Sequence, residues 1–535
     1  MVNNPHQDDV INNINGIFVV DAGPGTGKTY TITKRYMNIL KSDGSVSIND
    51  ILLLTFTDNA AENMKEKIIN SITKKHADIN ILDAKISTFH SFCNNILKRN
   101  PENAPKYLGI EETLSKKYDI LENEILEQIR FKRIYYAFRK NNITKYERLF
   151  KTLEPNDVLN IIKKLLSKGI FPKKEGWFLD GEEKLIGNFE EFIKLANEIN
   201  TPKQGKKGLT QSKLLKSMKD KLRNKHYLDF PEDCLLKKQV NPKYLEMVFN
   251  ENREDLISFI HDIYYEYIRQ SVIENKLTFD FLIMFVFLLL YHDHELRKRN
   301  SFKYVMVDEF QDTNEMQFML TLLFMETNNL CVVGDWKQGI YGFRHATIDN
   351  ILNFKEKLKE HKTLLNKDYP RINFDVGCCD KEFVINFRSS QKILDFAKKA
   401  LIVKGSKSEE VNIEEINKKI VELKANYKLD EYSDIKFFKA KNGDNGRENE
   451  IKLILSKVQE IVNNEDYKII EFNGDNAPKY RNIEYKDIAI LSRSRNFCLE
   501  LQEKALEIGI PINYDGGVEL FKTAEALLLL AWLRL

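Results

Sequence analysis

Residues Asp21–Thr31 read DAGPGTGKTYT, and this stretch decides the fold. Its central part, AGPGTGKT, fits the relaxed form of the phosphate-binding P-loop, with Ala22 where the strict pattern has glycine. In such a loop the backbone N–H groups face the phosphates, and the following helix directs its positive end at them. Lys28 is expected to reach the β- and γ-phosphates, and Thr29 to bind Mg²⁺. The pattern predicts a nucleotide site made of Ala22, Gly23, Pro24, Gly25, Thr26, Gly27, Lys28 and Thr29.

The segments around this loop alternate between short apolar runs and stretches with helical spacing. Residues 17–21 (IFVVD) lead into the loop, and residues 29–41 (TYTITKRYMNILK) follow it with apolar residues at helical intervals. Strands that are apolar along their length and separated by helices are typical of a parallel sheet covered on both faces, so the expected class is α/β. The predicted strands are residues 17–21, 51–55 (ILLLT), 85–88, 304–308 (YVMVD) and 330–334 (LCVVG).

One of these strands ends in two acids, in the stretch VMVDEFQDTN at residues 305–314. Asp308 at the strand tip can hold Mg²⁺ through its water shell, and Glu309 can orient and deprotonate an attacking water. The alternative is a capped strand end with surface acids. The P-loop in the same chain disfavours it, and the two motifs together predict an ATPase that binds Mg²⁺.

Two regions have a different pattern. Residues 100–276 are rich in Lys, Glu, Leu and Ile with helical spacing, which indicates a helical insertion. Within it, residues 201–226 are dense in lysine; this run is either a solvated face or, as a second interpretation, a nucleic-acid contact. After residue 386 a further α/β pattern begins, with predicted strands at residues 435–438, 487–491 and 512–514.

The composition is that of a globular chain with balanced charge. Its 535 residues include 82 Lys and Arg against 79 Asp and Glu, a net charge of +3, so any nucleic-acid surface must be local. The six cysteines form neither a zinc nor a disulfide pattern, and the adjacent Cys378 and Cys379 are expected to be loop thiols. The apolar run 281–291 (FLIMFVFLLLY) is too short to span a bilayer and predicts a buried helix. No membrane partner is expected, and the cytoplasm is the default location.

A further stretch, VVGDWKQGIYGFRHA at residues 332–346, combines a polar group, aromatics and an arginine at the end of a strand. Aromatic rings stack on unpaired bases regardless of sequence; alone, they would be interpreted as core residues. In order along the chain stand TFTDNAA (55–61), STFHSF (87–92), LTFDFLI (277–283), VDEFQDTN, this stretch and NFRSS (386–390). With this ordered set the chain resembles the UvrD/RecB helicases of superfamily 1. The forms ISTFHSFC and GDWKQGIYGFR resemble the RecB/AddA branch more closely.

The resemblance implies roles for individual residues. Gln7 matches the glutamine that contacts the adenine edge, and Tyr30 and Phe387 match the positions that enclose the adenine ring, where the family often has Arg and Tyr. Gln338 resembles the γ-phosphate sensor, and Arg388 an arginine that stabilises charge on the γ-phosphate. The positions that contact single-stranded DNA in the family correspond to Phe56, Thr88, His90, Tyr341, Phe343 and Arg344, with Phe343 often Trp in the family.

The resemblance also implies a domain plan. Residues 1–99 and 277–385 would form the first RecA-like ATP-binding domain, residues 100–276 the helical insertion domain, and residues 386–535 the N-terminal portion of a second RecA-like domain. The implied function is an ATP-dependent DNA helicase or translocase that moves 3′ to 5′ on single-stranded DNA, or on duplex with a single-stranded tail, in repair or recombination. Its cofactors would be ATP and Mg²⁺.

The end of the chain departs from the family pattern. It reads ALLLLAWLRL, an apolar helix pattern without a glycine cap, and the late helicase motifs and a nuclease domain are missing from the sequence. The expectation is a truncated helicase. The alternative is a nucleotide-gated DNA-binding or assembly subunit, inactive alone, that works with a nuclease or helicase partner subunit. A small-molecule kinase would leave most of the motifs unexplained. No function is predicted for residues 362–383.

Overall fold

The computed structural model of the chain describes residues 5–42, 44–73, 84–179, 181–185, 235–236, 239–240, 242–339, 347–403, 420–427, 434–440, 445–471 and 479–514. The chain divides into two compact units, Asn3–Asp430 and Glu431–Leu535, the second together with Met1–Val2. The P-loop and all the site residues predicted above belong to the larger unit.

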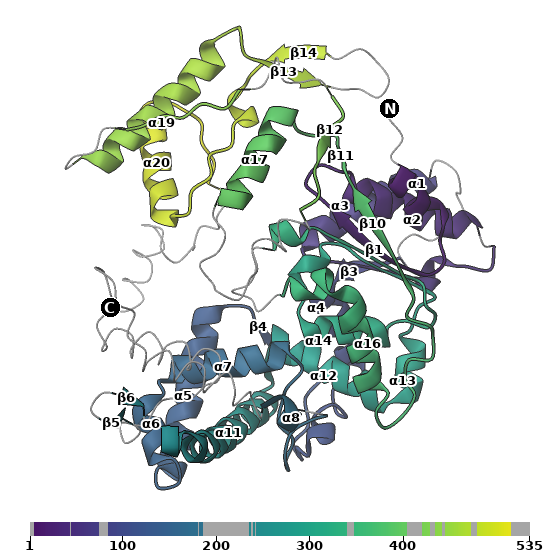
Figure 1. The fold of residues 1–535 in the computed structure, drawn as a ribbon, viewed down its shortest axis with the longest axis vertical. Coiled ribbons are helices and arrows are strands. Elements are labelled where there is room, and N and C mark those ends of the chain that lie inside the picture. Colours follow the sequence, from purple (N-terminus) through teal and green to yellow (C-terminus); the bar gives the residue numbers. More distant parts are fainter. Residues whose placement is uncertain are drawn as a thin grey trace. The chain divides into compact units, whose positions relative to one another are not determined.

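The larger unit is built on a parallel sheet of six strands (Figure 1). All five strands predicted before residue 335 are present in it, within one residue of the expected bounds. The sheet order is β10 (Cys378–Phe383), β1 (Ile17–Ala22), β9 (Leu330–Gly334), β8 (Tyr304–Val307), β2 (Ile51–Thr55) and β3 (Lys85–Thr88), and every ladder is parallel.

Side chains of successive residues in these strands enter two different hydrophobic cores. In β1, Ile17 and Val19 join one core, and Phe18 and Val20 join the other. Both faces of the sheet are therefore covered, as the uniformly apolar strands predict. One face carries α1 (Pro5–Asn12), α2 (Lys28–Ser42) and α3 (Asp58–Thr73). The other carries α4 (Phe89–Arg99), α12 (Phe279–His292), α14 (Glu315–Leu323) and α16 (Phe354–Leu365).

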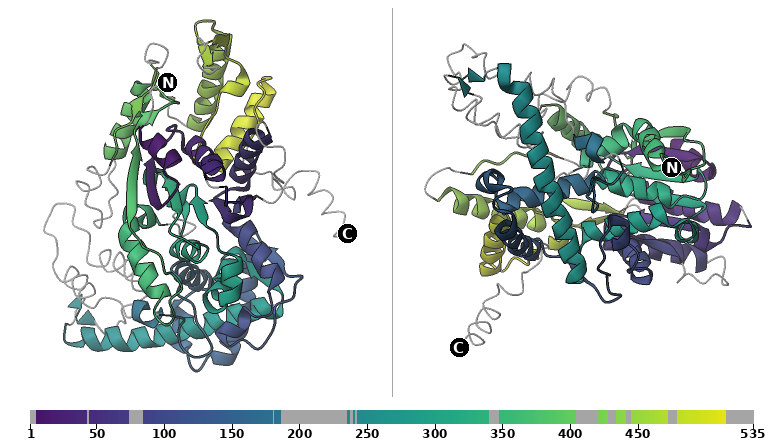
Figure 2. Two further views of the ribbon diagram at one scale, coloured as in Figure 1. Left: turned by 90° about the vertical axis from the view of Figure 1, so that its right-hand side faces the viewer. Right: turned by 90° about the horizontal axis from the view of Figure 1, so that it is seen from below.

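Between β3 and β8 the described residues are mainly helical (Figure 2). A short pair of parallel strands, β4 (Asp119–Leu121) and β7 (Lys276–Thr278), joins the start and end of this region. Helix α12 follows β7 and is buried from Phe281 to Tyr291, so the predicted buried helix is confirmed. Among the residues that the structure describes, none of the helices is long and apolar enough to cross a membrane. The helices of the region are α5 (Glu124–Asn142), α6 (Glu147–Thr152), α7 (Pro155–Ser167), α8 (Gly181–Leu185) and α11 (Pro242–Ile273).

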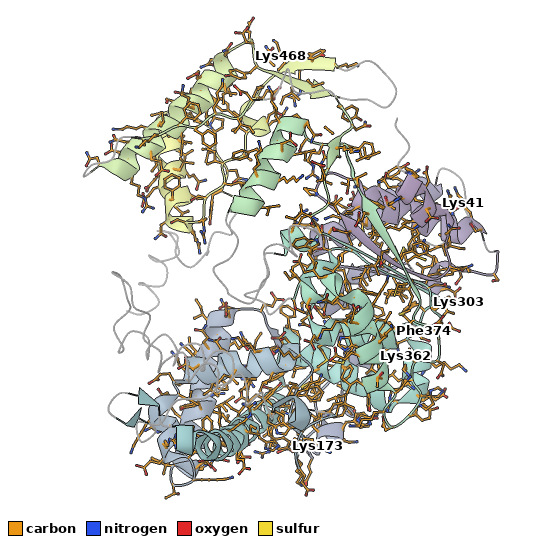
Figure 3. The ribbon with its side chains drawn as sticks, viewed as in Figure 1. Lys41, Lys173, Lys303, Lys362, Phe374 and Lys468 are labelled. Atoms are coloured by element: carbon orange, nitrogen blue, oxygen red, sulfur yellow. The ribbon has the colours of Figure 1, made fainter. Side chains whose placement is uncertain are left out.

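The segment after α16, for which the sequence predicted no function, supplies the edge strand of the sheet. Lys362 donates to the Phe374 carbonyl at 2.7 Å (Figure 3), and Arg371 lies over the Tyr291 ring with its guanidinium carbon 3.5 Å from the centroid. These contacts fold the segment back so that β10 pairs with β1 along its whole length. The adjacent Cys378 and Cys379 therefore lie in a strand, and their prediction as loop thiols was wrong.

After β10, three short elements still belong to the larger unit. They are β11 (Ile385–Asn386), β12 (Lys424–Ala425), which pairs with β11 in parallel, and α17 (Gln391–Val403). The smaller unit contains α19 (Gly446–Asn463), α20 (Arg495–Glu507) and an antiparallel pair, β13 (Lys468–Glu471) with β14 (Lys479–Asn482).

The strands predicted at residues 435–438, 487–491 and 512–514 were wrong, because none of these segments has strand structure. Asp487 ends a short 3-10 turn, and its carboxylate accepts from Arg481 and from the Glu484 backbone instead of starting a ladder. The side chains of Phe437 and Leu491 are 81% and 94% exposed. A parallel strand needs cover on both faces, and these positions have none.

His361 on α16 provides a test of packing on the face of the sheet that carries α4, α12, α14 and α16. Its ring is 1% exposed, packs edge-on against Phe318, and neither ring nitrogen has a hydrogen-bond partner in the part of the chain that the structure describes. Burial, with the nearby Lys184 and Lys357, lowers the pKa of His361 to about 3. A histidine that stays neutral when folded binds its proton more readily when unfolded. Stability is therefore full above the ordinary pKa of about 6.5 and falls as the pH drops from there toward 3.

We expect His361→Leu to remove this acid sensitivity. Between pH 7.5 and pH 5 the wild type should lose about 2 kcal/mol more unfolding free energy than the variant, from a slope of about 1.4 kcal/mol per pH unit below 6.5. Urea titrations of both proteins at the two pH values measure the difference. Equal losses in the two proteins would contradict the assignment.

Candidate nucleotide and nucleic-acid site

The P-loop joins β1 to α2 at the carboxyl edge of the sheet. Gly25 and Gly27 adopt positive φ angles of 71° and 89°, which side chains other than glycine rarely tolerate. The Thr26 hydroxyl donates to the Gly23 carbonyl at 2.8 Å and closes the loop. Lys28 and Thr29 open α2, so the positive end of the helix lies at the loop, as the sequence predicts.

A hollow of about 380 Å³ lies over the loop and gathers most of the predicted nucleotide-site residues. The hollow is also lined by Phe387 and Arg388, which lie more than 350 residues after the loop in sequence. Tyr30 is 58% exposed at its rim. The lining residues are Pro24, Gly25, Gly27, Lys28, Thr29, Tyr30, Glu309, Gln338, Phe387 and Arg388.

The two acids after β8 lie beside the loop in different environments. Lys28 Nζ is 3.1 Å from Glu309 Oε2, and Glu309 itself has a left-handed backbone with φ of 50°. Such strain in a non-glycine residue is concentrated at functional sites. Asp308 is buried, and its Oδ1 has no hydrogen-bond partner among the residues that the structure describes. Burial and the negative charge of Glu309 raise the pKa of Asp308 to about 7, against the opposing effect of Lys28.

A second hollow, of about 570 Å³, adjoins this acid pair. Thr29, Asp308 and Gln338 contribute to its wall from the nucleotide side, and Phe56 from the side of α3. Thr29, Glu309 and Gln338 line both hollows. The predicted catalytic residues and one predicted DNA contact therefore share a continuous wall.

A network of polar side chains behind this wall was not predicted from the sequence. Gln311 is 2% exposed; its Nε2 donates to Glu309 Oε2 at 2.9 Å, and its Oε1 accepts from the Asp335 backbone at 2.9 Å. Asp335 in turn accepts from Gln338 Nε2 at 2.7 Å and pairs with Lys337 at 2.8 Å. Gln311 lies two residues after Glu309, and Asp335 directly follows β9, so their places after strand ends within the motifs already noted are the one signal that could have found them.

Lys337 extends the network to the start of the P-loop. Its ammonium group lies 3.2 Å from Asp21 Oδ1 as well as 2.8 Å from Asp335, and its side chain is 9% exposed. Burial raises the pKa of Asp21, and the charge of Lys337 opposes that shift. The ends of β1 and β9 are thus joined by a partly buried ion pair.

Gln7 lies beneath the loop on α1 and not in the hollow. Its Nε2 donates to the Thr26 carbonyl at 2.8 Å and to Thr31 Oγ1 at 3.1 Å. A Cβ on Gly27 would come within 2.7 Å of the same nitrogen, so Gln7 needs glycine at that position. Gln7 therefore lies next to the loop as predicted, but its side-chain Nε2 is hydrogen-bonded to Thr26 and Thr31.

The predicted DNA contacts are only partly described. Phe56 lines the second hollow, and the His90 ring lies 4.6 Å from the Phe279 ring. Thr88 is 5% exposed and caps α4 by accepting from the Ser91 backbone at 3.2 Å, a structural role that the sequence did not reveal. Three further residues lie outside the described residues: Tyr341, Phe343 and Arg344. The lysine-dense stretch at residues 203–225 also lies outside them.

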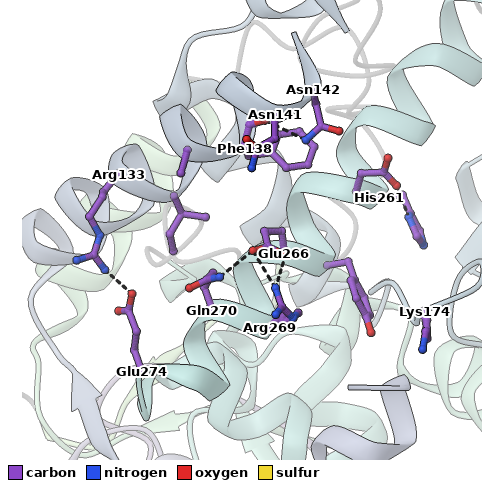
Figure 4. A pocket seen from close by; sticks show the side chains of 14 residues that line it. Arg133, Phe138, Asn141, Asn142, Lys174, His261, Glu266, Arg269, Gln270 and Glu274 are labelled. Carbon is purple, nitrogen blue, oxygen red and sulfur yellow. Dashed lines mark hydrogen bonds and ion pairs between the residues drawn. The ribbon is translucent and has the colours of Figure 1, made fainter. Parts of the chain in front are cut away.

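Another hollow, of about 650 Å³, lies between α5 and α11 (Figure 4). Its basic groups are already paired with acids: Arg133 with Glu274, and Arg269 with Glu266. Because the charges in its wall are satisfied within the chain, this hollow is not a candidate for the phosphate chemistry that the P-loop implies.

The chain matches two protein-family models. The model of the UvrD/REP helicase N-terminal domain matches residues 3–359, and that of the UvrD-like helicase C-terminal domain matches residues 382–535. The second match covers the segment in which an incomplete domain was expected, so sequence of the C-terminal domain is present, and truncation stays a prediction.

Three relatives illustrate the similarity. The chain is 27% identical over 536 positions to the ATP-dependent DNA helicase PcrA of Bacillus subtilis, covering 99% of this chain and 53% of PcrA. It is 26% identical to a probable DNA helicase II homolog of Mycoplasma capricolum, covering 96% of this chain and 52% of the homolog. It is 23% identical to the ATP-dependent DNA helicase UvrD1 of Mycobacterium tuberculosis, covering 99% of this chain and 52% of UvrD1.

The chain thus spans about half the length of the curated relatives it matches. None of these three bears a RecB or AddA name, and assignment to that branch stays a prediction. The N-terminal model alone accounts for well over half of the residues, on the sheet that carries the P-loop and the acid pair. This protein belongs to the UvrD/REP helicase family.

Proposed function

We propose that the chain is the ATP-hydrolysing part of a DNA helicase or translocase. The observation that carries this proposal is the hollow in which Lys28, Glu309 and Gln338 meet Phe387 and Arg388. Groups from two distant segments enclose one nucleotide-sized space, an arrangement that lets ATP binding and hydrolysis change how the segments are held together. The names of the family and of its relatives support DNA as the partner.

The residues present fit a magnesium ion. Within the described ranges Asp308 has a buried carboxylate oxygen without a hydrogen-bond partner, and Thr29 lines the same hollow. No group of three or more His, Cys, Asp or Glu suited to a metal exists among the described residues, which agrees with a Mg²⁺ held by one or two protein groups and by phosphate. Thr29 and Asp308 would hold the ion, which when bound neutralises developing charge on the phosphates.

Each residue in the hollow then has a defined task. The backbone of Gly23–Thr29 cradles the phosphates, and Lys28 exchanges its contact with Glu309 for the β- and γ-phosphates. Glu309, released from Lys28 but still held by Gln311, orients the attacking water and accepts its proton. Gln338 senses the γ-phosphate, and Arg388 stabilises its charge in the transition state. Tyr30 and Phe387 enclose the adenine ring; Gln7, which lies beneath the loop, is assigned to the edge of that ring by the motif resemblance alone.

The DNA side of the proposal uses the aromatic and polar residues that the motif resemblance assigns to single-stranded DNA. Phe56, Thr88, His90, Tyr341, Phe343 and Arg344 would contact single-stranded DNA, by stacking and by phosphate contacts. We further propose 3′ to 5′ movement, a role in repair or recombination in the cytoplasm, and kinship with the RecB/AddA branch. These points rest on the motif resemblance.

The domain plan is proposed on the same basis. Residues 1–99 and 277–385 form the first RecA-like domain, and residues 100–276 a helical insertion. Residues 386–535 form the start of a second RecA-like domain. The sheet supports the first assignment, since β3 and β8 are both joined to β2 although the helices of residues 105–273 lie between them in sequence.

The test is steady-state ATP hydrolysis by this chain with and without single-stranded DNA. We expect stimulation by DNA, with a 3′-tailed duplex stimulating more than a blunt duplex of equal length. Absence of stimulation together with measurable ATP and DNA binding would favour the alternative, a nucleotide-gated subunit that needs a partner. Failure to bind ATP at all would sink both proposals.

A further inference from the structure

Asn386, which the motif analysis left without a role, forms three side-chain hydrogen bonds beside residues that line the hollow. It is 1% exposed and lies at the end of β11, next to Phe387 and Arg388. Its Oδ1 accepts from the backbone N–H of Arg388 at 2.8 Å and of Ser389 at 2.7 Å. Its Nδ2 donates to the Pro24 carbonyl in the P-loop. Since Oδ1 serves two donors and Nδ2 one acceptor, the orientation of the amide is fixed by its partners.

A backbone hydrogen bond also joins the turn at residues 386–389 to the P-loop. The Phe387 N–H donates to the Gly25 carbonyl at 2.8 Å, directly beside the Asn386 contact. A Cβ on Gly25 would come within 2.6 Å of Arg388 Cβ and 2.8 Å of Asn386 Nδ2. Glycine at this position is therefore needed both for its positive φ and for the close approach of the turn at residues 386–389.

The P-loop thus has two functional faces. N–H groups of a P-loop face the phosphates, and here two carbonyls of the loop, those of Pro24 and Gly25, accept from Asn386 Nδ2 and the Phe387 N–H. Two hydrogen bonds and one close packing contact, that of Gly25 with Arg388 Cβ, therefore join the loop to residues 386–389. Arg388 is the exposed group on that turn.

We propose that Asn386 is a positioning residue that latches the turn carrying Arg388 to the carbonyl face of the P-loop. This inference rests on the proposed ATP hydrolysis at the same site. The latch sets where Arg388 and Phe387 stand relative to the bound nucleotide, so its loss lowers turnover through Arg388 and not through the phosphate contacts of Lys28.

Two substitutions distinguish the contact of Asn386 with the Pro24 carbonyl from its contacts within the turn at residues 386–389. Asn386→Ser keeps an uncharged acceptor for the N–H groups of residues 388 and 389, but it is too short to reach the Pro24 carbonyl. Asn386→Ala removes both functions. Asn142→Ala is the matched control, because Asn142 is a half-buried asparagine whose side chain donates to the Phe138 carbonyl at 2.9 Å, away from the site.

We expect Asn386→Ser to lower kcat about 10- to 100-fold, the range that misplacement of a reacting group by about 1 Å can cost. The KM for ATP should change much less, and Asn142→Ala should match the wild type. In an Arg388→Ala background, Asn386→Ser should cost less than about twofold more, because residues that act as one unit are not additive. Wild-type kcat in Asn386→Ser, or full additivity with Arg388→Ala, would overturn the proposal.

Amide hydrogen exchange tests the latch without using activity. In the ATP-free chain, Asn386→Ser should speed exchange at Phe387, whose N–H is bonded to Gly25. If the wild type proves inactive, the proposed function fails, while this exchange result still decides the latch: unchanged protection at Phe387 overturns it. Faster exchange with unchanged kcat overturns the positioning role.

Discussion

Glu309→Gln is expected to lower kcat for ATP hydrolysis about 10²- to 10⁴-fold, the range that a positioned general base contributes. The KM for ATP should stay close to that of the wild type, because the amide has the shape of the carboxylate and the phosphate contacts of Lys28 are kept. Gln311 Nε2, now 2.9 Å from the Glu309 carboxylate, can still donate to the amide oxygen. The loss therefore falls on proton transfer and not on the fold.

Lys28→Ala should differ from Glu309→Gln in one respect that steady-state kinetics detect. Removing the ammonium group takes away a phosphate contact in the ground state as well as in the transition state, so the affinity for ATP falls together with turnover. Glu326→Gln, at an exposed glutamate beyond α14, is the control and should leave both constants unchanged. A Glu309→Gln variant that keeps a tenth or more of wild-type turnover would exclude Glu309 as the base.

The sequence predicted the parts of the site that are contained in a few consecutive residues. The P-loop works through the backbone of one short segment, and Asp308 and Glu309 are adjacent at one strand end. The residue types in each motif indicate its chemistry. The apolar runs that precede the two motifs predict buried strands. The structure places these two motifs 3.1 Å apart, at Lys28 and Glu309.

The links between motifs could not be predicted, because they join residues far apart in sequence. Gln311 and Asp335 are 24 residues apart, and Asn386 and Pro24 are 362 apart. A buried amide is not recognisable as such in sequence, since asparagine and glutamine are more often exposed. Gln311 finds its partner Asp335 because β8 and β9 are neighbours in the sheet, and Asn386 finds Pro24 because the turn at residues 386–389 packs on the loop.

Strand β10 shows the same limit in the fold. Its sequence, CCDKEF, has three charged residues and no apolar run, so no pattern indicates a strand. Its place is set by distant partners: Lys381 pairs with Asp9 on α1, and Asp380 with Lys355 on α16. Charged side chains are usual on an edge strand, where they oppose pairing with other chains. The three strands wrongly predicted in the smaller unit show the opposite situation. Their apolar runs suggested strands, but side chains such as Phe437 and Leu491 are exposed.

Arg35 carries the second large expected effect. It is 1% exposed on α2, and its guanidinium donates to the carbonyls of Val10, Asn13 and Ile14, the last two at 2.7 Å. These carbonyls lie at and beyond the C-terminal end of α1, where helix carbonyls lack partners and a positive charge is favourable. The guanidinium also lies over the Phe18 ring, 4.7 Å from its centroid. One buried cation therefore anchors α1, and with it Gln7.

We expect Arg35→Met to destabilise the larger unit by about 3 kcal/mol or more, because it leaves buried carbonyls unpaired at about 1–3 kcal/mol each. Methionine fills much of the same volume but has no hydrogen-bond donors. The loss of unfolding free energy therefore reflects the missing hydrogen bonds and charge more than a cavity. Asn38→Ala is the matched control: Asn38 donates one bond, to the Ile11 carbonyl at 2.8 Å, and its loss should cost about 1 kcal/mol. Urea titration followed by tryptophan fluorescence compares the three proteins.

The functional consequence follows from the place of Gln7 on the same helix. With α1 loosened, the Gln7 amide no longer has a fixed position at Thr26 and Thr31, and discrimination between ATP and GTP should fall while phosphate contacts persist. Competition of GTP against ATP hydrolysis measures this in Arg35→Met and Asn38→Ala. Equal discrimination in a destabilised Arg35→Met would mean that Gln7 is held by the loop and not by α1. The two bonds from Gln7, to Thr26 in the P-loop and to Thr31 on α2, would then be strong enough to hold α1 in place.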